Sequence, residues 1–182
     1  KCLDKFIAHC ERKNLKFNHV LDVGAWVGTW TMKMNPFCGR VIAFEPDPIH
    51  YECLVKNLPD DVETHQLAVG NNKKMISLSE DDFTQAKRVI GDGTIPMVTI
   101  DSMNLNDIDL IKIDVEGYEM EVLKGAENTL DNIEYLMIEL NNNAKKYGSS
   151  NLEIEKYLSK KGFKIMIKVW PDVVWQKKGK SK

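Results

Sequence analysis

The chain has 182 residues, and its 25 lysines and arginines against 27 aspartates and glutamates give a formal net charge of −2. This length predicts a single domain, residues 1–182, that buries enough surface to fold without a disulfide or a structural metal. The near-neutral charge argues against a nucleic-acid partner, because it provides no long-range attraction for phosphates. No apolar run reaches membrane-spanning length and no signal peptide is present, so we expect a cytoplasmic protein without a membrane span. The sequence leaves the oligomeric state open.

The spacing of apolar and turn-forming residues predicts the elements in chain order. The first 18 residues form a leading amphipathic helix, since Leu3, Phe6 and Cys10 recur at helical spacing. Strands are expected at 19–23, 40–45, 62–69, 75–78, 98–100, 109–115, 134–140, 163–169 and 173–176. Further helices are expected at 28–36, 48–58, 118–130 and 151–161. We expect the polar residues 79–95 to form a loop that is part of an acceptor site or its lid, and residues 177–182 to form a basic tail.

Strands that alternate with helices predict an α/β fold with right-handed crossovers. The sheet is then doubly wound and mostly parallel, and the last two strands close it as an antiparallel C-terminal hairpin. Ligands of such a sheet bind beyond the carboxyl ends of its strands. The informative residues are therefore those that end or follow a strand: Gly24, Glu45, Ala68, Asp114 and Glu139.

The first strand runs into a turn at residues 24–28 that indicates which cofactor binds. A dinucleotide site needs a third glycine in the middle of this turn, where Trp26 stands, and the lysine of a phosphate-binding loop is absent too. This argues against an NAD-dependent oxidoreductase. A cofactor with a ribose but no phosphate fits better, and S-adenosylmethionine (SAM) is such a cofactor. We expect Glu45, at the end of the next strand, to bind the ribose hydroxyls.

Other residues near this turn have two interpretations each. Gly24 and Gly28 either allow a ligand to approach the backbone or only pack the strand against the helix, and we favour the ligand. Asp22 either accepts a bond from the ammonium of SAM, directly or through water, or bonds loop amides. His50 either approaches the cofactor or lies on the surface, which we favour. The expected cofactor contacts are Asp22, Gly24, Ala25, Trp26, Gly28, Glu45, Pro46 and Ala68.

Five segments in this order resemble the FkbM family of SAM-dependent methyltransferases, which belongs to the class I superfamily. They are Asp22-Val23-Gly24-Ala25 with Gly28, Val41-Ile42-Ala43-Phe44-Glu45-Pro46, Ala68-Val69-Gly70, Val98-Thr99-Ile100-Asp101, and Lys112-Ile113-Asp114-Val115-Glu116-Gly117 followed by Glu119, Val122-Leu123 and Gly125-Ala126. The resemblance spans about residues 19–140. It implies a Rossmann-like class I methyltransferase fold and O-methylation, commonly of sugars or natural-product hydroxyls. One position departs from the family, which usually carries Asn where Trp26 stands.

Acidic residues gather at the predicted crevice and suggest two mechanisms. In the first, Asp114 is the general base for an acceptor hydroxyl, with Glu116, Glu139 and Lys112 grouped with it as catalytic residues. Lys112 lies two residues earlier on the same strand face, so a purely structural ion pair with Asp114 is the alternative. In the second mechanism, Asp114 and Glu139 hold a divalent ion such as Mg²⁺ together with Glu116 or Glu119. We favour the base and predict no metal site.

The prediction from sequence is thus a SAM-dependent O-methyltransferase that acts on a small-molecule or glycan acceptor, through a hydroxyl of a sugar or glycosylated metabolite. The choice of a sugar rests on the family resemblance. Two alternatives stay open: a nucleic-acid methyltransferase, and a SAM-binding module without catalysis. Aromatic residues frame the acceptor or fill the core, and burial in the core is favoured for each of Trp26, Tyr118, Trp170 and Trp175.

Overall fold

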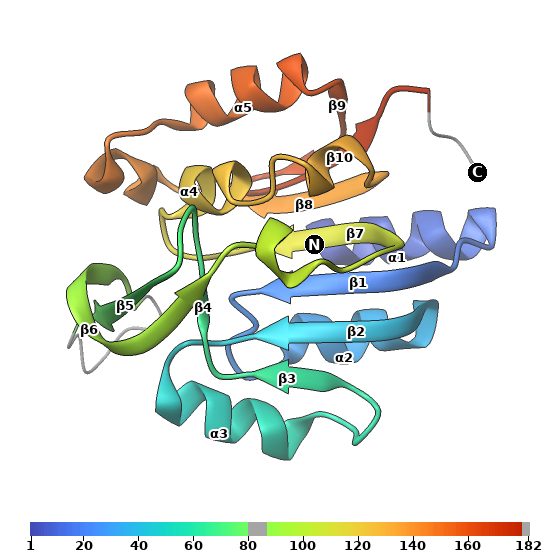
Figure 1. Cartoon of the computed structure of the whole chain (residues 1–182). Coiled ribbons are helices and arrows are strands. Elements are labelled where there is room, and N and C mark those ends of the chain that lie inside the picture. Colours follow the sequence, from blue (N-terminus) through green and yellow to red (C-terminus); the bar gives the residue numbers. More distant parts are fainter. Residues whose placement is uncertain (80–86, 180–182) are drawn as a thin grey trace.

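The computed structural model describes residues 1–79 and 87–179 (Figure 1). Its α-helices are α1 (Cys2–Lys13), α2 (Thr29–Met34), α3 (Pro48–Asn57), α4 (Glu119–Lys124) and α5 (Asn151–Lys160). Its strands are β1 (Phe17–Val23), β2 (Cys38–Phe44), β3 (Glu63–His65), β4 (Ala68–Val69), β5 (Lys74–Leu78), β6 (Val89–Val98), β7 (Ile108–Ile113), β8 (Tyr135–Glu139), β9 (Phe163–Val169) and β10 (Asp172–Lys177). Within these described residues, no helix combines the length and the apolar character that a membrane crossing requires.

The strands form a large sheet and a small one. The large sheet has the order β3-β2-β1-β7-β8-β10-β9, in which β3, β2, β1, β7 and β8 run parallel to one another and β10 runs antiparallel to both β8 and β9. The small sheet has the order β4-β6-β5. The mostly parallel α/β sheet with an antiparallel C-terminal hairpin confirms the predicted fold class.

Helices cover both faces of the large sheet. Successive residues of a strand point to opposite faces, so the apolar strands have side chains on both faces that the helices bury. On one face, residues such as Leu21 and Ile111 pack against α4 and α5 in one core cluster. On the other face, Val20 and Leu110 pack against α1, α2 and α3 in a second cluster. The central strands are apolar on both sides, so the polar residues that remain in them stand out as candidates for function.

The expected strand 62–69 is wrong as a single element. Its first part, β3, pairs with β2 in the large sheet, whereas Ala68 and Val69 pair with β6 in the small sheet. Ala68 packs in the separate core of the small sheet. The chain therefore leaves one sheet for the other between His65 and Ala68, which a count of apolar residues along the sequence does not reveal.

The expected loop 79–95 and the expected strand 98–100 are also wrong in part. Residues 89–98 form β6, which pairs antiparallel with β5, the strand expected at 75–78. The glycines that suggested a loop instead allow close pairing, since a Cβ on Gly93 would lie 2.0 Å from Ser77 Oγ. Residues 80–86 of the proposed lid lie outside the described residues, as do 180–182 of the basic tail.

The helix expected at 118–130 ends early, at Lys124. A Cβ on Gly125 would lie 1.9 Å from the carbonyl oxygen of Gly70, so the chain passes close to another backbone there. Residues 129–131 then form a short 3₁₀ turn, at which Asp101 accepts bonds from the N–H groups of Asn128 and Thr129. The leading helix is shorter as well and ends at Lys13.

Candidate active site

The turn after β1 joins the ends of three neighbouring strands. The N–H groups of Gly24 and Ala25 both donate to the carbonyl oxygen of Phe44, at 3.0 and 2.9 Å, which ties the turn to the end of β2. Gly24 has a φ of 77°, and a Cβ there would lie 1.9 Å from the backbone oxygen of Asp114. Only glycine allows this approach between the ends of β1 and β7.

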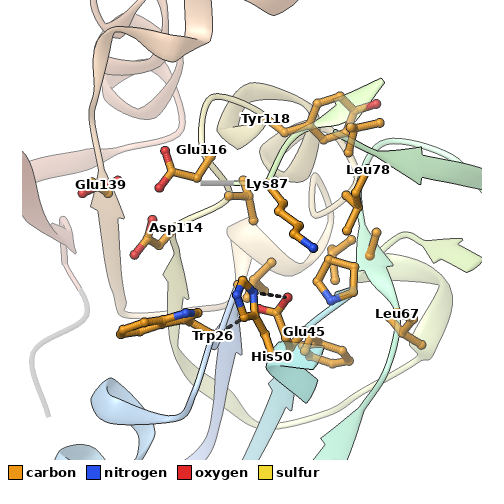
Figure 2. A pocket seen from close by; sticks show the side chains of 18 residues that line it. Trp26, Glu45, His50, Leu67, Leu78, Lys87, Asp114, Glu116, Tyr118 and Glu139 are labelled. Atoms are coloured by element: carbon orange, nitrogen blue, oxygen red, sulfur yellow. Dashed lines mark hydrogen bonds and ion pairs between the residues drawn. The ribbon is translucent and has the colours of Figure 1, made fainter. Parts of the chain in front are cut away.

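A cavity of about 210 Å³ lies beyond these strand ends (Figure 2). Glu45 lies at its edge and is held by the backbone: Oε2 accepts from Trp26 N at 2.8 Å, and Oε1 accepts from Asp47 N at 2.9 Å. The residue is 6% exposed, so its carboxylate is largely shielded from bulk solvent where it lines the cavity. Expected cofactor contacts that line this first cavity are Gly24, Trp26, Glu45, Pro46 and Ala68.

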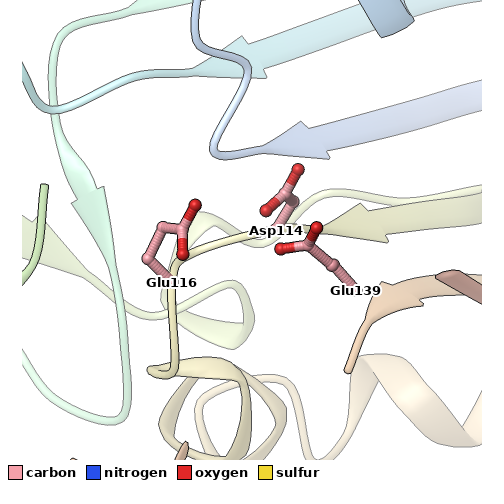
Figure 3. Close-up of side chains that lie close together, drawn as sticks. All are labelled: Asp114, Glu116 and Glu139. Carbon is pink, nitrogen blue, oxygen red and sulfur yellow. The ribbon is translucent and has the colours of Figure 1, made fainter. Parts of the chain in front are cut away.

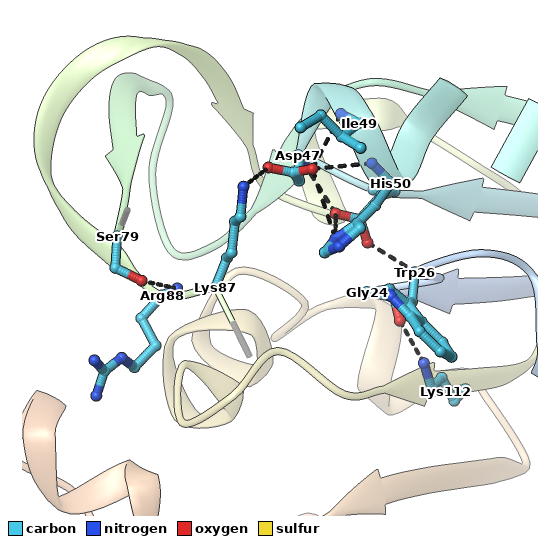
Figure 4. Close-up of polar contacts among 10 residues, drawn as sticks. Gly24, Trp26, Asp47, Ile49, His50, Ser79, Lys87, Arg88 and Lys112 are labelled. Carbon is cyan, nitrogen blue, oxygen red and sulfur yellow. Dashed lines mark hydrogen bonds and ion pairs between the residues drawn. The ribbon is translucent and has the colours of Figure 1, made fainter. Parts of the chain in front are cut away.

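His50 also lines the first cavity, so the surface position favoured for it is wrong. Its Nδ1 lies 3.8 Å from Glu45 Oε1 and 3.7 Å from Asp47 Oδ1, and its side chain is 19% exposed. The nearby carboxylate of Glu45 is the main cause that raises the pKa of His50. Lys87 approaches from the small-sheet side and its Nζ lies 2.6 Å from Asp47 Oδ2 (Figure 4). The sequence did not single out Lys87, because it lies in a segment without a clear period.

Trp26 forms a wall of the first cavity and has an unusual backbone. Its φ of 51° lies in the left-handed region, which a bulky residue rarely adopts. Asn adopts this conformation more readily than most residues, which agrees with the Asn that the family usually carries here. The indole packs edge to face with the ring of His50, at a centroid distance of 6.4 Å.

Three carboxylates meet on the opposite side of the first cavity from Glu45. One oxygen each of Asp114, Glu116 and Glu139 lies within 4.8 Å of the other two (Figure 3). We call these three residues the acidic cluster. Asn141 Nδ2 donates to Glu116 and to Glu139, each at 3.1 Å. The sequence predicted this convergence from the strand ends.

The proximity of the three groups changes their acidity. Burial, followed by the charge of Asp114, raises the pKa of Glu139 to about 8. The same two causes, in the same order, raise the pKa of Glu116. Glu116 and Glu139 therefore bind a proton more readily than isolated glutamates do, as expected where like charges are close together and partly desolvated.

Glu119 does not join the acidic cluster, contrary to the expectation that four acids converge. Its Oε1 accepts from Gly117 N at 2.9 Å and from Val115 N at 3.4 Å, and the side chain is 1% exposed. Burial raises its pKa to about 7. Glu119 thus shapes the turn that presents Glu116, whose φ is 55°.

Asp22 lies beneath the site rather than in it. It is fully buried and lines neither this cavity nor the next one, and Thr31 Oγ1 donates to its Oδ2 at 2.5 Å. Lys112 stands between Asp22 and the cavities: its Nζ lies 3.0 Å from Asp22 Oδ1 and 3.6 Å from Asp114 Oδ2. The direct contact with SAM expected for Asp22 is therefore wrong, whereas a contact through water stays a prediction. Lys112 and Thr31, not the loop amides of the other interpretation, contact its carboxylate.

A second cavity of about 250 Å³ adjoins the first and shares Gly24, Trp26, Asp114 and Glu139 with it. Ala25 and Lys112 line only the second cavity. Gly28 lines neither cavity, and a Cβ there would meet Leu58 at 2.9 Å, so its position reflects packing rather than ligand approach.

Two more residues line the cavities, and two of the aromatic candidates do not. Asp172 lines the second cavity because β10 pairs it with Glu139, a register that the sequence does not give. Tyr118 lines the first cavity although it is 8% exposed. Trp175 is 2% exposed and fills the core, as favoured, whereas Trp170 is 58% exposed and is therefore not the core residue we favoured.

Comparison with known proteins agrees with this geometry. The family model described as the methyltransferase FkbM domain matches residues 22–165. The hexuronic acid methyltransferase AglP of Haloferax volcanii is 28% identical over 130 residues, which are 65% of this chain and 54% of that protein.

Solved structures show a similar fold. A crystal structure of an FkbM methyltransferase from Methylobacillus flagellatus aligns with a TM-score of 0.65 at 19% identity, over 88% of this chain and 43% of that one. Magnesium protoporphyrin IX methyltransferase from Synechocystis, solved with bound SAM, aligns with a TM-score of 0.59 at 12% identity, over 96% and 77%.

The chain thus spans about half the length of the Haloferax relative. The family model covers most of the chain and contains the glycine turn, Glu45 and the acidic cluster within its bounds. On this evidence the chain belongs to the FkbM methyltransferase family.

Proposed function

We propose that this protein is a SAM-dependent O-methyltransferase, with the ribose of the cofactor bound by Glu45. The observation that carries the proposal is that one cavity has Glu45 on one side and the acidic cluster on the other. Two backbone N–H groups fix the carboxylate of Glu45, so it is already oriented for a pair of ribose hydroxyls. Pro46 and Ala68 then border the adenine.

The amino-acid end of SAM extends into the second cavity in this proposal. The two cavities adjoin at Gly24 and Trp26, so a long ligand can lie across the turn. The sulfur of the cofactor then lies near Asp114, which lines both cavities. A sulfonium is cationic, so the anionic cluster stabilises it and faces its methyl group.

The reaction follows from this placement. The acceptor oxygen attacks the methyl carbon as the carbon–sulfur bond breaks, and the bonding electrons stay on sulfur, which leaves as S-adenosylhomocysteine (SAH). Asp114 takes the hydroxyl proton as the new bond forms, and a positioned base of this kind contributes about 10²–10⁴-fold. Alignment of the two substrates contributes up to about 7–11 kcal/mol.

A sugar hydroxyl is the acceptor in this proposal. The support is the Haloferax relative, whose name assigns it a hexuronic acid, together with the family resemblance. Carboxylates and amides, here Glu116 of the acidic cluster and Asn141 beside it, are groups that bind sugar hydroxyls.

Deuteriomethyl-labelled SAM tests this proposal. The protein is incubated with the labelled cofactor and a panel of methyl glycosides, including methyl glucuronide, and mass spectrometry detects and locates the transferred group. Transfer to a sugar hydroxyl supports the proposal. SAH binding in calorimetry without transfer to any acceptor of the panel, or to RNA added as a further acceptor, indicates a binding module without catalysis. Transfer to RNA, with binding that falls steeply as salt rises, favours a nucleic-acid acceptor.

A further inference from the structure

One buried cation connects the cofactor turn to the acidic cluster. Lys112 Nζ donates to the carbonyl oxygen of Gly24 at 2.5 Å, a bond drawn in Figure 4, and it also contacts Asp22 and Asp114. The side chain is 9% exposed. Burying an ammonium costs free energy unless it is paired and hydrogen-bonded. The ammonium of Lys112 contacts Asp22 on β1, Gly24 in the turn after β1 and Asp114 just after β7.

The surroundings of Asp114 are otherwise acidic. The charged groups that face it come from its own strand and from each element packed around it: Lys112 on β7, Glu116 on the following turn, Glu119 on α4, Glu139 on β8, Asp172 on β10 and, through Lys112, Asp22 on β1. Like charges at these distances repel the carboxylate of Asp114. Lys112 opposes this repulsion because it lies within ion-pair distance.

Lys112 is itself held in place by buried residues. Asp22 is fully buried and pairs with the ammonium at 3.0 Å, and Thr31 of α2 donates to Asp22. The contacts thus run in one chain from α2 through β1 to the end of β7. Such a chain fixes the ammonium on one side, so that its contacts with Gly24 and Asp114 hold these two groups at a set separation.

We propose that Lys112 is a positioning residue for methyl transfer, which acts by holding the Asp114 carboxylate in place and aimed at the sulfonium of the cofactor bound over Gly24. The inference rests on the proposed function. Lys112 then affects the reaction by orienting Asp114. It neither contacts the reacting atoms nor serves only as a structural ion pair.

Ligand affinities test this role without an identified acceptor. Calorimetry compares three probes: 5′-methylthioadenosine, which lacks the amino-acid end; SAH, which is neutral at sulfur; and sinefungin, which carries an ammonium where SAM carries its methyl group. We expect the wild-type protein to bind sinefungin about tenfold more tightly than SAH, because the ammonium faces Asp114. Lys112→Met and Asp114→Asn should each remove most of this preference and leave the affinity for methylthioadenosine within about twofold.

The double variant separates positioning from other roles. If Lys112 acts through Asp114, then Lys112→Met/Asp114→Asn shows no smaller preference than Asp114→Asn alone. Lys161→Met is the matched control, since Lys161 also forms ion pairs with its side chain largely covered, at 18% exposed, but lies at the end of α5. Its preference should equal that of the wild type. Lys112→Gln answers the same question if Lys112→Met does not fold, because it keeps a donor for Gly24 without the charge.

Three results overturn the inference: an unchanged preference in Lys112→Met, an equal loss of affinity for all three probes, or additive losses in the double variant. Failure of the wild-type protein to bind either SAH or methylthioadenosine is a different result. It removes the proposed function, and the role of Lys112 with it.

Discussion

The two halves of the carboxyl edge of the large sheet treat their carboxylates in opposite ways. At the ends of β1 and β2, Glu45 accepts bonds from two backbone N–H groups. At the ends of β7 and β8, Asp114 and Glu139 lie against each other and against Glu116. In the first half, backbone N–H dipoles compensate the charge of Glu45. In the second half, the three carboxylates of the acidic cluster repel one another.

This difference suits two tasks. Binding a neutral ribose requires an oriented acceptor whose position does not depend on its ligand, which backbone donors provide. Stabilising a sulfonium requires anionic groups beside it, and accepting a proton requires a positioned carboxylate. The acidic cluster provides both. Gly24 and Lys112 join the halves, since Gly24 lies against the backbone of Asp114 and Lys112 of β7 donates to the carbonyl oxygen of Gly24. The comparison therefore predicts that substitutions in the first half change affinity and those in the second change rate.

The largest effect is expected for Asp114→Asn. Loss of the base should lower the rate of methyl transfer by about 10²–10⁴-fold, whereas the affinity for SAH changes by less than about threefold, because Glu45 still binds the ribose. Single-turnover kinetics and calorimetry measure the two quantities, with Asp60→Asn on the exposed surface as the control. Full turnover in Asp114→Asn would falsify the role of a base.

Gly24→Ala tests the contact between the halves. The added Cβ meets the Asp114 backbone at 1.9 Å with φ at 77°, so we expect a loss of about 3 kcal/mol or more in the free energy of unfolding. Gly148→Ala is the matched control, because its φ is 75° but no atom lies within 4 Å of its Cβ, so only the backbone cost of about 1–2 kcal/mol remains. Urea unfolding measures both, and equal losses would contradict the close approach.

Glu45→Ala tests the binding half. Removing two charge-assisted acceptors for the ribose should weaken SAM binding by at least about tenfold, with the fold retained. Glu63→Ala serves as the control, since Glu63 lies on the edge strand β3 and pairs with Arg40. Unchanged affinity in calorimetry would exclude Glu45 from the ribose site.

The acidic cluster should also make stability depend on pH. Glu139 has a pKa of about 8 in the folded protein, above the usual value of 4.5, so the folded state binds more protons than the unfolded state between these values. The free energy of unfolding therefore falls as pH rises from about 4.5 to 8. Glu139→Gln should show a shallower decline over this range. Thermal unfolding at a series of pH values measures it, and identical slopes for both proteins would refute the raised pKa.

The smallest effect is expected on removing divalent ions. The base mechanism predicts that EDTA leaves the rate of methyl transfer unchanged. The three carboxylates of the acidic cluster also offer oxygen ligands of the kind that Mg²⁺ takes, so the assay distinguishes the two mechanisms. A loss of activity in EDTA that Mg²⁺ restores would replace the base by a metal-activated hydroxyl.

The sequence located the strand ends and hence most of the site. Gly24, Glu45, Asp114 and Glu139 were predicted to meet because parallel strands bring their carboxyl ends to one edge. Side-chain directions within turns were not predictable. Glu119 turned to the N–H groups of its own turn instead of the cavity, and Asp22 turned to Lys112.

The pairing of strands that are distant in the sequence was also not predictable. Asp172 joins the site through the register of β10 on β8, and Lys87 through the small sheet. Neither register nor sheet membership follows from local periodicity, as the division of residues 62–69 between two sheets illustrates.

That division separates one border of the first cavity from the large sheet. Two residues lie between the end of β3 and the start of β4, and among the described residues the hydrogen bonds of the β5–β6 hairpin do not enter the ladder of the large sheet. Leu78, Lys87 and Val89 of this region nevertheless border the cavity. Substitutions at these positions can thus change the shape of the cavity without changing the register of the strands that precede Glu45 and Asp114.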